Sequence, residues 1–304
     1  MHAELARALA ALEPELGPPA GEAVALDGGI TNRNFRITLE RAGDVVVRLP
    51  GKDTELLGID REAERAATEA AFAAGVGPEV VAFLVDPPCL VTAFIPGSPL
   101  PPEQLRGRLE EIADSLRAVH AGPAVRARFD AFAIVDAYRA TATAQGTPVP
   151  REYGRLLAGA LGIRAALTGP EHDPVPCHND LLNANFIHDG ERVRIVDWEY
   201  AGMGDRFFDL GNLSVNNGLS ETDDEALLAV YFGEPCTDAR FAALRLMRIM
   251  SDFREGMWGV VQQGISELDF DFAAYADEHL TRVGGALDDP RLETWLEAAR
   301  GAAP

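Results

Sequence analysis

The segment C-H-N-D-L-L-N-A-N-F at residues 177–186 decides how the rest of the sequence is interpreted. His178, Asp180 and Asn185 have the spacing H-x-D-x-x-x-x-N, which is typical of the catalytic loop of kinases. In such a loop the aspartate accepts or orients a proton and the asparagine binds a metal ion. The pattern also occurs by chance, so the residues around it decide its meaning.

The residues after this segment predict a β-hairpin. N-F-I-H at 185–188 is followed by Asp189-Gly190 and then by E-R-V-R-I-V-D-W at 191–198. Asp-Gly is typical of a tight hairpin turn. Because a hairpin returns the end of its second strand to the start of its first, Asn185 and Asp197 should lie at the same end. An amide oxygen and a carboxylate there form the kind of site that Mg²⁺ prefers when it also binds ATP phosphates.

These residues predict three roles. Asp180 accepts the proton of a substrate hydroxyl or orients that hydroxyl, and Asn185 and Asp197 hold the metal. His178 is expected to bond the backbone and keep the loop in shape. The alternative is that Asp180 caps a turn and Asp197 ends a strand. The combination of the spacing with the hairpin favours the catalytic interpretation.

Upstream of the loop, short β-branched runs separated by turn residues predict a small sheet with one helix. The helix is expected at 61–74, because Asp60 can cap it, the segment is rich in Ala and Glu, and Gly75 follows it. The predicted strands lie at 35–39, 45–49, 80–85 and 89–95, the first two as a hairpin.

Downstream of Pro102 the pattern is mostly helical, apart from a non-helical stretch at 174–200 and a polar loop at about 140–150. The clearest helical segments are 103–120, 154–168, 223–233, 239–262 and 270–284. The predicted class is α+β in two lobes: an N-lobe at 1–95 with a small antiparallel sheet and one main helix, and a larger, mostly helical C-lobe at 96–304 that carries the hairpin.

Two further features of the N-lobe suggest phosphate binding. The segment at 26–35, L-D-G-G-I-T-N-R-N-F, offers Gly29, Thr31 and Asn32 just before a strand, which suits a backbone cradle for phosphates, although an ordinary turn would look similar. Arg48 ends the run V-V-V-R, where kinases place a lysine that contacts phosphates and pairs with a helical glutamate. Glu62 and Glu64 are the candidate partners, and Glu64 is favoured because it shares a helix face with several alanines.

The composition excludes several classes of partner. The 304 residues carry 48 acidic against 27 basic side chains, a net charge of -21, which repels nucleic acids and anionic lipids and attracts small cations. The three cysteines are scattered without metal or disulfide spacing, which suits a reducing cytoplasm. No apolar run approaches the ~20 residues that span a bilayer, so we expect neither secretion nor membrane insertion.

The chain resembles the choline/ethanolamine kinase branch of the aminoglycoside phosphotransferase-like superfamily, whose fold is protein-kinase-like. The matching segments cover most of the chain: G-G-I-T-N-R-N-F at 28–35, V-V-V-R-L-P-G at 45–51, I-D-R-E-A-E at 59–64, the catalytic loop, D-W-E-Y-A-G-M-G-D-R-F-F-D-L-G-N at 197–212 and F-R-E-G-M-W-G-V-V-Q-Q-G-I-S-E-L-D-F at 253–270. The resemblance implies ATP and Mg²⁺ as cofactors, Arg48 in place of the kinase lysine, Asp197 as a metal ligand, and a hinge at 92–95, with Thr92 and Phe94, that holds adenine.

The resemblance also implies a pocket for the ammonium group of an amine-bearing alcohol. Tyr200, Asp209 and Trp258 match positions in such a pocket, and Glu199 is a further candidate for contact with the substrate. An amine over a tryptophan face gains about 0.5 to 2 kcal/mol. Glu255 lies three residues before Trp258, so the two would share a helix face and clasp one cation.

Trp258 has an alternative role, because Met250, Met257 and Val261 on the same helix would equally suit a core aromatic. The sequence also departs from well-known choline kinases, which tend to have an aromatic residue where Glu255 stands and an acid where Asn216 stands. These differences suit an amine with N–H donors better than trimethylammonium. The predicted substrate is therefore a small amino-alcohol such as choline or ethanolamine; alternatives are an aminosugar, an aminoglycoside or another small alcohol, or a nucleotide-binding pseudokinase without turnover.

Overall fold

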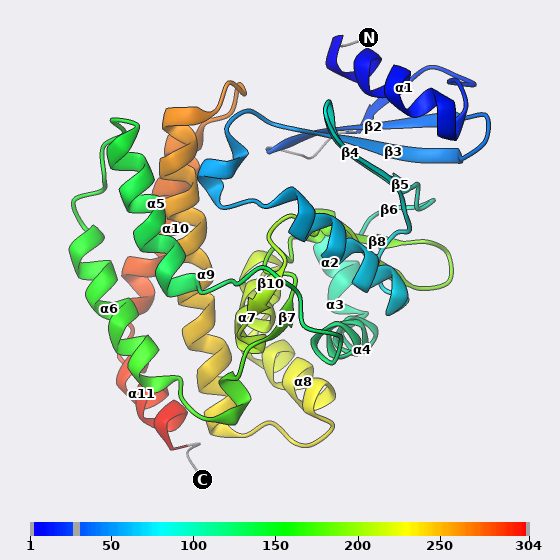
Figure 1. Cartoon of the computed structure of the whole chain (residues 1–304). Coiled ribbons are helices and arrows are strands. Elements are labelled where there is room, and N and C mark those ends of the chain that lie inside the picture. Colours follow the sequence, from blue (N-terminus) through cyan, green and yellow to red (C-terminus); the bar gives the residue numbers. More distant parts are fainter. Residues whose placement is uncertain (1–2, 27–30, 302–304) are drawn as a thin grey trace.

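The computed structural model describes residues 3–26 and 31–301 (Figure 1). Its first part contains α1 (Ala3–Leu16), β1 (Val24–Leu26), β2 (Asn32–Leu39), β3 (Gly43–Pro50), α2 (Arg61–Ala73), β4 (Val80–Val85) and β5 (Pro88–Ala93). The rest contains β6 (Ser98–Pro99), α3 (Pro102–Arg106), α4 (Leu109–His120), α5 (Ala131–Ala144), α6 (Tyr153–Ala166), β7 (Val175–Cys177), β8 (Phe186–His188), β9 (Val193–Ile195), β10 (Gly202–Gly204), α7 (Arg206–Asn216), α8 (Glu221–Phe232), α9 (Asp238–Ile265), α10 (Phe272–Leu287) and α11 (Leu292–Arg300).

The first part is a five-stranded antiparallel sheet in the order β1-β2-β3-β5-β4. Residues of β2 and β3 mostly alternate between buried positions and more accessible ones, as expected of strands with one face against a core. The apolar face of α1 packs with that face, and the two form a small core of their own (Figure 1). The hairpin predicted at 35–39 and 45–49 is confirmed within the longer strands β2 and β3.

Helix α2 begins as predicted. The Asp60 side chain accepts hydrogen bonds from the backbone N–H groups of Glu62 and Ala63, which satisfies two donors of the first turn. Ala63, Ala67 and Ala71 form its buried face, and their small side chains let the helix approach its neighbours closely. This fixed approach decides where Glu64, on the same helix, can reach.

The remainder is mostly helical and is organised around α9, which has 28 residues and packs against α5, α7, α10 and α11. In Figure 1 these helices lie side by side, away from the sheet. The predicted non-helical stretch is also confirmed: it contains β7 and the hairpin of β8 and β9, with β6 pairing to β8. The α+β class is therefore correct.

Several local predictions were wrong. The helix expected at 103–120 is interrupted at Gly107-Arg108, which separates α3 from α4. The polar loop is shorter than expected, because α5 continues to Ala144. The hairpin turn is wider than a two-residue turn: residues 189–192 connect the strands, and the backbone N–H of Asp189 donates to the oxygen of Arg192 (3.0 Å). Helices α1, α5 and α7 were not predicted.

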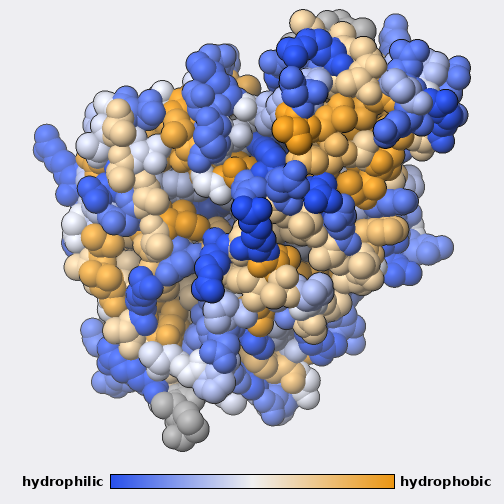
Figure 2. All heavy atoms as spheres, viewed as in Figure 1, coloured by the Kyte–Doolittle hydropathy of each residue, from blue (hydrophilic) through white to orange (hydrophobic). Residues whose placement is uncertain are grey.

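The predicted boundary between lobes, at residues 95 and 96, falls between the end of β5 and the start of β6, and the division itself stays a prediction. An exposed ion pair also connects the segment after β3 to the segment after α9, since Lys52 Nζ lies 2.8 Å from Glu267 Oε1. In the space-filling view hydrophilic side chains cover much of this face, and hydrophobic ones gather near the sheet (Figure 2). Within the described ranges, no helix is both long enough and apolar enough to cross a membrane.

Candidate active site

His178 holds the segment 177–186 in shape, as predicted. Its ring is fully buried, and Nε2 lies 2.9 Å from the backbone oxygen of Val196, just after β9. Nδ1 accepts the backbone N–H of Asp180 (3.1 Å), so Nε2 carries the proton that is donated to Val196. Burial lowers the pKa of His178, which favours this neutral form. The ring therefore joins the loop to the hairpin and fixes the backbone at Asp180.

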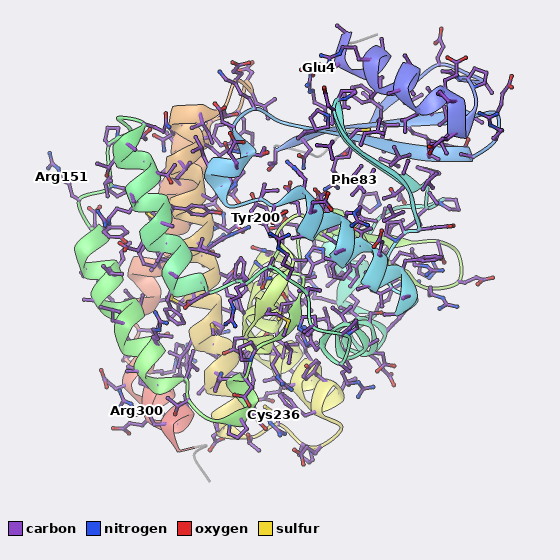
Figure 3. All side chains as sticks on the ribbon, in the orientation of Figure 1. Glu4, Phe83, Arg151, Tyr200, Cys236 and Arg300 are labelled. Carbon is purple, nitrogen blue, oxygen red and sulfur yellow. The ribbon has the colours of Figure 1, made fainter. Side chains whose placement is uncertain are left out.

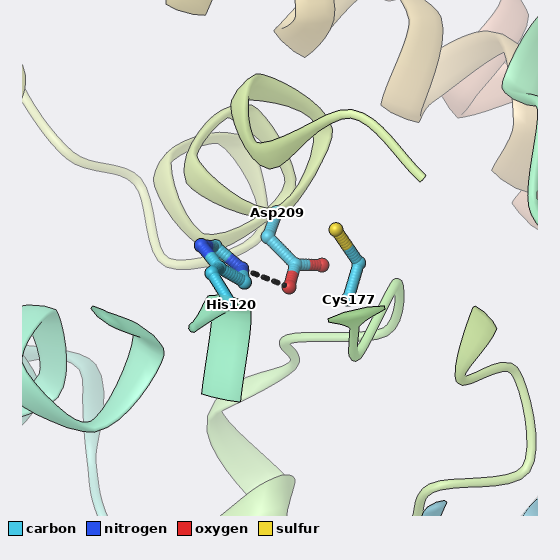
Figure 4. A group of neighbouring side chains, drawn as sticks. All are labelled: His120, Cys177 and Asp209. Carbon is cyan, nitrogen blue, oxygen red and sulfur yellow. Dashed lines mark hydrogen bonds and ion pairs between the residues drawn. The ribbon is translucent and has the colours of Figure 1, made fainter. Parts of the chain in front are cut away.

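Asp209, on α7, holds the same loop through its carboxylate. Its two carboxylate oxygens accept the backbone N–H groups of His178 (2.8 Å) and Asn179 (2.7 Å), and Nε2 of His120 lies 3.0 Å from one of them (Figure 4). Asp209 has no exposed surface. The assignment of Asp209 to the substrate pocket is therefore wrong, because its oxygens are occupied beneath the loop.

His120, Cys177 and Asp209 lie close enough together to resemble a metal site. Burial raises the pKa of the Cys177 thiol well above its usual range, so the sulfur remains protonated and is a poor ligand. Nδ1 of His120 is also engaged, 2.6 Å from the hydroxyl of Tyr231. The cluster is thus a hydrogen-bonded support for the loop.

We expect Asp209→Asn to lower the free energy of unfolding by roughly 3 kcal/mol, because one buried acceptor becomes a donor that faces a backbone N–H. Denaturant unfolding measures this change. Asp277→Asn on the exposed face of α10 is the matched control and should be close to neutral. Equal stability of the two variants would refute this role of Asp209.

Asp180 is nearly buried, with 9% of its surface exposed. Burial raises its pKa to about 8, although the guanidinium of Arg254, 3.4 Å from Oδ1, opposes the shift. Its backbone oxygen accepts the amide N–H of Asn185 (2.8 Å), which fixes the orientation of that side chain. A carboxyl group in this setting binds a proton more readily than an exposed one.

Asn185 and Asp197 lie at the same end of the hairpin, as predicted, because the backbone N–H of Val196 donates to the oxygen of Asn185 (3.0 Å). Both line a cleft of about 350 Å³ between the sheet and the hairpin. Thr92 and Phe94, predicted to lie at an adenine hinge, line it as well. The cleft therefore brings together residues from β3, α2, the segment after β5 and the hairpin.

Arg48 pairs with Glu64, as predicted: NH1 lies 2.9 Å from Oε1, and the same nitrogen also contacts Asp197. Glu64 is buried, whereas Glu62 is half-exposed and pairs with Arg65. The guanidinium of Arg48, which is always charged, therefore lies between the buried carboxylate of Glu64 and the predicted metal ligand Asp197.

Arg61 connects several of the remaining predicted residues, a role that no pattern in the sequence indicated. Its guanidinium lies 2.7 Å from Glu64, 3.2 Å from Glu199 and 3.0 Å from the amide oxygen of Asn32. Asn32 in turn donates to Glu199 (2.8 Å). Glu199 therefore joins the segment after the hairpin to the start of β2 and to Arg61 of α2, and its contact with substrate stays a prediction.

The predicted phosphate cradle includes Thr31 and Gly29. The backbone oxygen of Thr31 lies against Gly51, where a Cβ atom would come within 2.1 Å of it, so the turn after β3 requires glycine at this position. Gly29 lies outside the described residues. The cradle itself stays a prediction.

Tyr200, Glu255 and Trp258 form the group that was predicted for an amine. Trp258 Nε1 donates to the hydroxyl of Tyr200 (2.9 Å), and Tyr200 lies near the centre of the molecule in Figure 3. Tyr275, which the sequence did not indicate, donates its hydroxyl to Glu255 Oε2 (2.8 Å). Trp258 is only 4% exposed and packs edge-on against Tyr275, so it is also the core aromatic of the alternative interpretation.

Arg254 is the second residue missed in this group. Its guanidinium lies 4.2 Å from the centre of the Tyr200 ring and contacts both Glu255 and Asp180. The only available signal was its position next to Glu255 in the segment at 253–270. Through Arg254 the aromatic group is continuous with the carboxylate of Asp180.

Comparison with known proteins gives consistent results. Residues 22–246 match the model of the "Phosphotransferase enzyme family". Ethanolamine kinase 2 of Homo sapiens is 26% identical over 303 residues, covering 89% of this chain and 77% of that protein. A choline/ethanolamine kinase family protein from Mesorhizobium loti is similar in structure, with a TM-score of 0.84 and 33% identity over 99% of this chain and 100% of its own. Choline kinase LicA from Streptococcus pneumoniae has the same fold, with a TM-score of 0.77 at 23% identity over 92% and 96% of the two chains.

Proposed function

Because the chain belongs to the phosphotransferase enzyme family and, within it, to the choline/ethanolamine kinase family, it is an ATP-dependent small-molecule kinase, and we propose that its acceptor is a small amino-alcohol of the choline and ethanolamine type. One observation carries the proposal. The carboxylate of Asp180 lies 3.5 Å from Nδ2 of Asn185 through Oδ2, and 3.4 Å from NH1 of Arg254, which contacts Tyr200 and Glu255, through Oδ1.

In the proposed reaction the acceptor lies beside Tyr200 with its hydroxyl against Asp180. The Asp180 carboxylate accepts the hydroxyl proton as the oxygen attacks the γ-phosphorus and ADP leaves. His178 and Asp209 fix the loop that presents this carboxylate.

The residues of the cleft suit Mg²⁺. Asn185 uses its amide nitrogen on the backbone oxygen of Asp180, so its amide oxygen remains as a ligand, and Asp197 adds a carboxylate. Mg²⁺ bound there would neutralise negative charge on the phosphates. Arg48, held by Glu64, is proposed to contact the α- and β-phosphates, and the backbone at 92–95 to receive adenine.

The Arg48–Glu64 pair can be tested with a matched control. We expect Glu64→Gln to raise the KM for ATP about tenfold, because a charge-assisted hydrogen bond that orients Arg48 is weakened. Glu62→Gln, two residues earlier on α2, removes an exposed carboxylate and should leave the KM unchanged. Steady-state kinetics at varied ATP give both values, and equal values for the two variants would show that the pair does not orient Arg48 for ATP.

The proposed function is tested by ADP release with Mg²⁺-ATP and a panel of acceptors: choline, ethanolamine, methylated ethanolamines, aminosugars and aminoglycosides. Turnover of an amino-alcohol at the highest kcat/KM supports it. Turnover of aminosugars alone would retain the mechanism and overturn the acceptor. ATP binding without turnover of any acceptor would favour a pseudokinase.

A further inference from the structure

The group proposed to receive the amine already contains a cation. Arg254 is 1% exposed, lies over the ring of Tyr200, and contacts Glu255 through NH1. An ammonium ion bound against Tyr200 and Glu255 would compete with this guanidinium for both. The guanidinium cannot lose its charge to relieve this competition, because arginine stays protonated in proteins. Recognition of the acceptor by its amine alone therefore fits this pocket poorly.

Arg254 also has unused donors. Among residues 3–26 and 31–301, neither Nε nor NH2 has a hydrogen-bond partner, although both atoms are buried. A buried charged group with unpaired N–H donors is costly, so these donors favour a ligand that supplies acceptor atoms. Nε and NH2 lie on one edge of the guanidinium and present parallel N–H groups, which match the two oxygens of a carboxylate.

The guanidinium that carries this edge lies on the acceptor side of the site. The cleft with the predicted metal ligands is lined by Arg48, Asn185 and Asp197, and Arg254 is not part of that lining. Arg254 instead contacts Tyr200 and Glu255, with NH1 3.4 Å from Asp180 Oδ1. A group bound to Arg254 would thus belong to the molecule whose hydroxyl faces Asp180.

We propose, resting on the proposed function, that the acceptor carries a carboxylate in addition to its amine and hydroxyl, and that Arg254 binds this carboxylate through Nε and NH2. The ion pair of Arg254 and Glu255 then serves both ends of the acceptor: the carboxylate pairs with Arg254 and the ammonium with Glu255. Because such an acceptor is zwitterionic, it enters between the two side chains without changing the net charge of the pocket. Arg254 is a specificity-determining residue in this arrangement.

Matched acceptors test the proposal. L-serine differs from ethanolamine, and L-homoserine from 3-aminopropan-1-ol, by one carboxylate. We expect the carboxylate-bearing member of each pair to have the higher kcat/KM. In Arg254→Gln the ratio of kcat/KM within a pair should fall about 10- to 100-fold, as expected for loss of a charge-assisted hydrogen bond. Arg248→Gln, on the same helix and paired with Asp224, is the control and should keep the ratio.

Other outcomes would overturn the inference. Preference for ethanolamine and 3-aminopropan-1-ol would refute it and leave the proposed function intact, whereas no turnover of any of the four or of choline would refute both. If Arg254→Gln lowered kcat/KM equally for both members of a pair, Arg254 would be structural. If Arg254→Gln does not fold, Arg254→Lys is measured in its place. Lysine keeps the charge but lacks the planar edge, so the ratio of kcat/KM within a pair should again fall.

Discussion

Replacing Asp180 with alanine is expected to lower kcat by roughly 10² to 10⁴, the range for loss of a positioned general base. Its carboxylate is the group proposed to take the hydroxyl proton, and alanine has no group that could accept that proton. Steady-state ADP release at saturating ATP and acceptor measures the loss.

The fold must be intact for this measurement to count. Asp173→Ala changes an exposed aspartate seven residues earlier in the same segment and should keep full activity. Circular dichroism and thermal unfolding compare the two variants with the parent. A folded Asp180→Ala protein with normal kcat would rule out the proposed mechanism.

The second large effect is expected for Asp197→Ala, which should abolish productive use of Mg²⁺-ATP. The change removes the only carboxylate proposed as a metal ligand and also a partner of Arg48. The loss of the ligand should appear as activity that stays near background even when Mg²⁺ is raised far above the concentration that saturates the parent enzyme.

Asp189→Asn is the matched control, because Asp189 lies in the turn at the opposite end of the same hairpin. Activity is measured against Mg²⁺ at fixed ATP, and calorimetry measures ATP binding with and without the metal. If Asp197→Ala showed the same dependence of activity on Mg²⁺ as the parent enzyme, Asp197 would not be a metal ligand.

Much of the site could be predicted because its signals are local. The spacing of His178, Asp180 and Asn185 lies within eight residues, and the hairpin that brings Asp197 back to Asn185 is formed by the next twelve. The Asp60 cap and the alanine face of α2 are also local, and together they predicted the pairing of Glu64 with Arg48.

The other contacts join residues that lie far apart in the sequence. Asp209 lies about thirty residues beyond the loop that it supports. The residues next to it in the sequence do not indicate whether its carboxylate faces a substrate or two backbone N–H groups. The same holds for Arg254, whose partners lie on the loop, after the hairpin and next to it on α9. Such roles follow from packing, which local patterns do not determine.

The missed helices have a related cause. Helix α5 contains alanine mixed with Ile, Val and Thr, which weakens its helical propensity, yet Asp130 caps it and Ala131, Val135, Tyr138 and Ala142 form its buried stripe against α9. Tertiary packing outweighs propensity here. The break between α3 and α4, in contrast, could have been predicted from Gly107, because glycine is unfavourable inside a helix.

Lys52, which forms the exposed ion pair with Glu267, is the one lysine of the sequence. Apart from the α-amino group, an amine-reactive fluorophore would therefore attach only to this side chain, which lies where the segment after β3 meets the segment after α9. Emission from a dye at that position would change if the two segments separate, so the natural sequence already provides an optical reporter of opening and closing without any engineered cysteine.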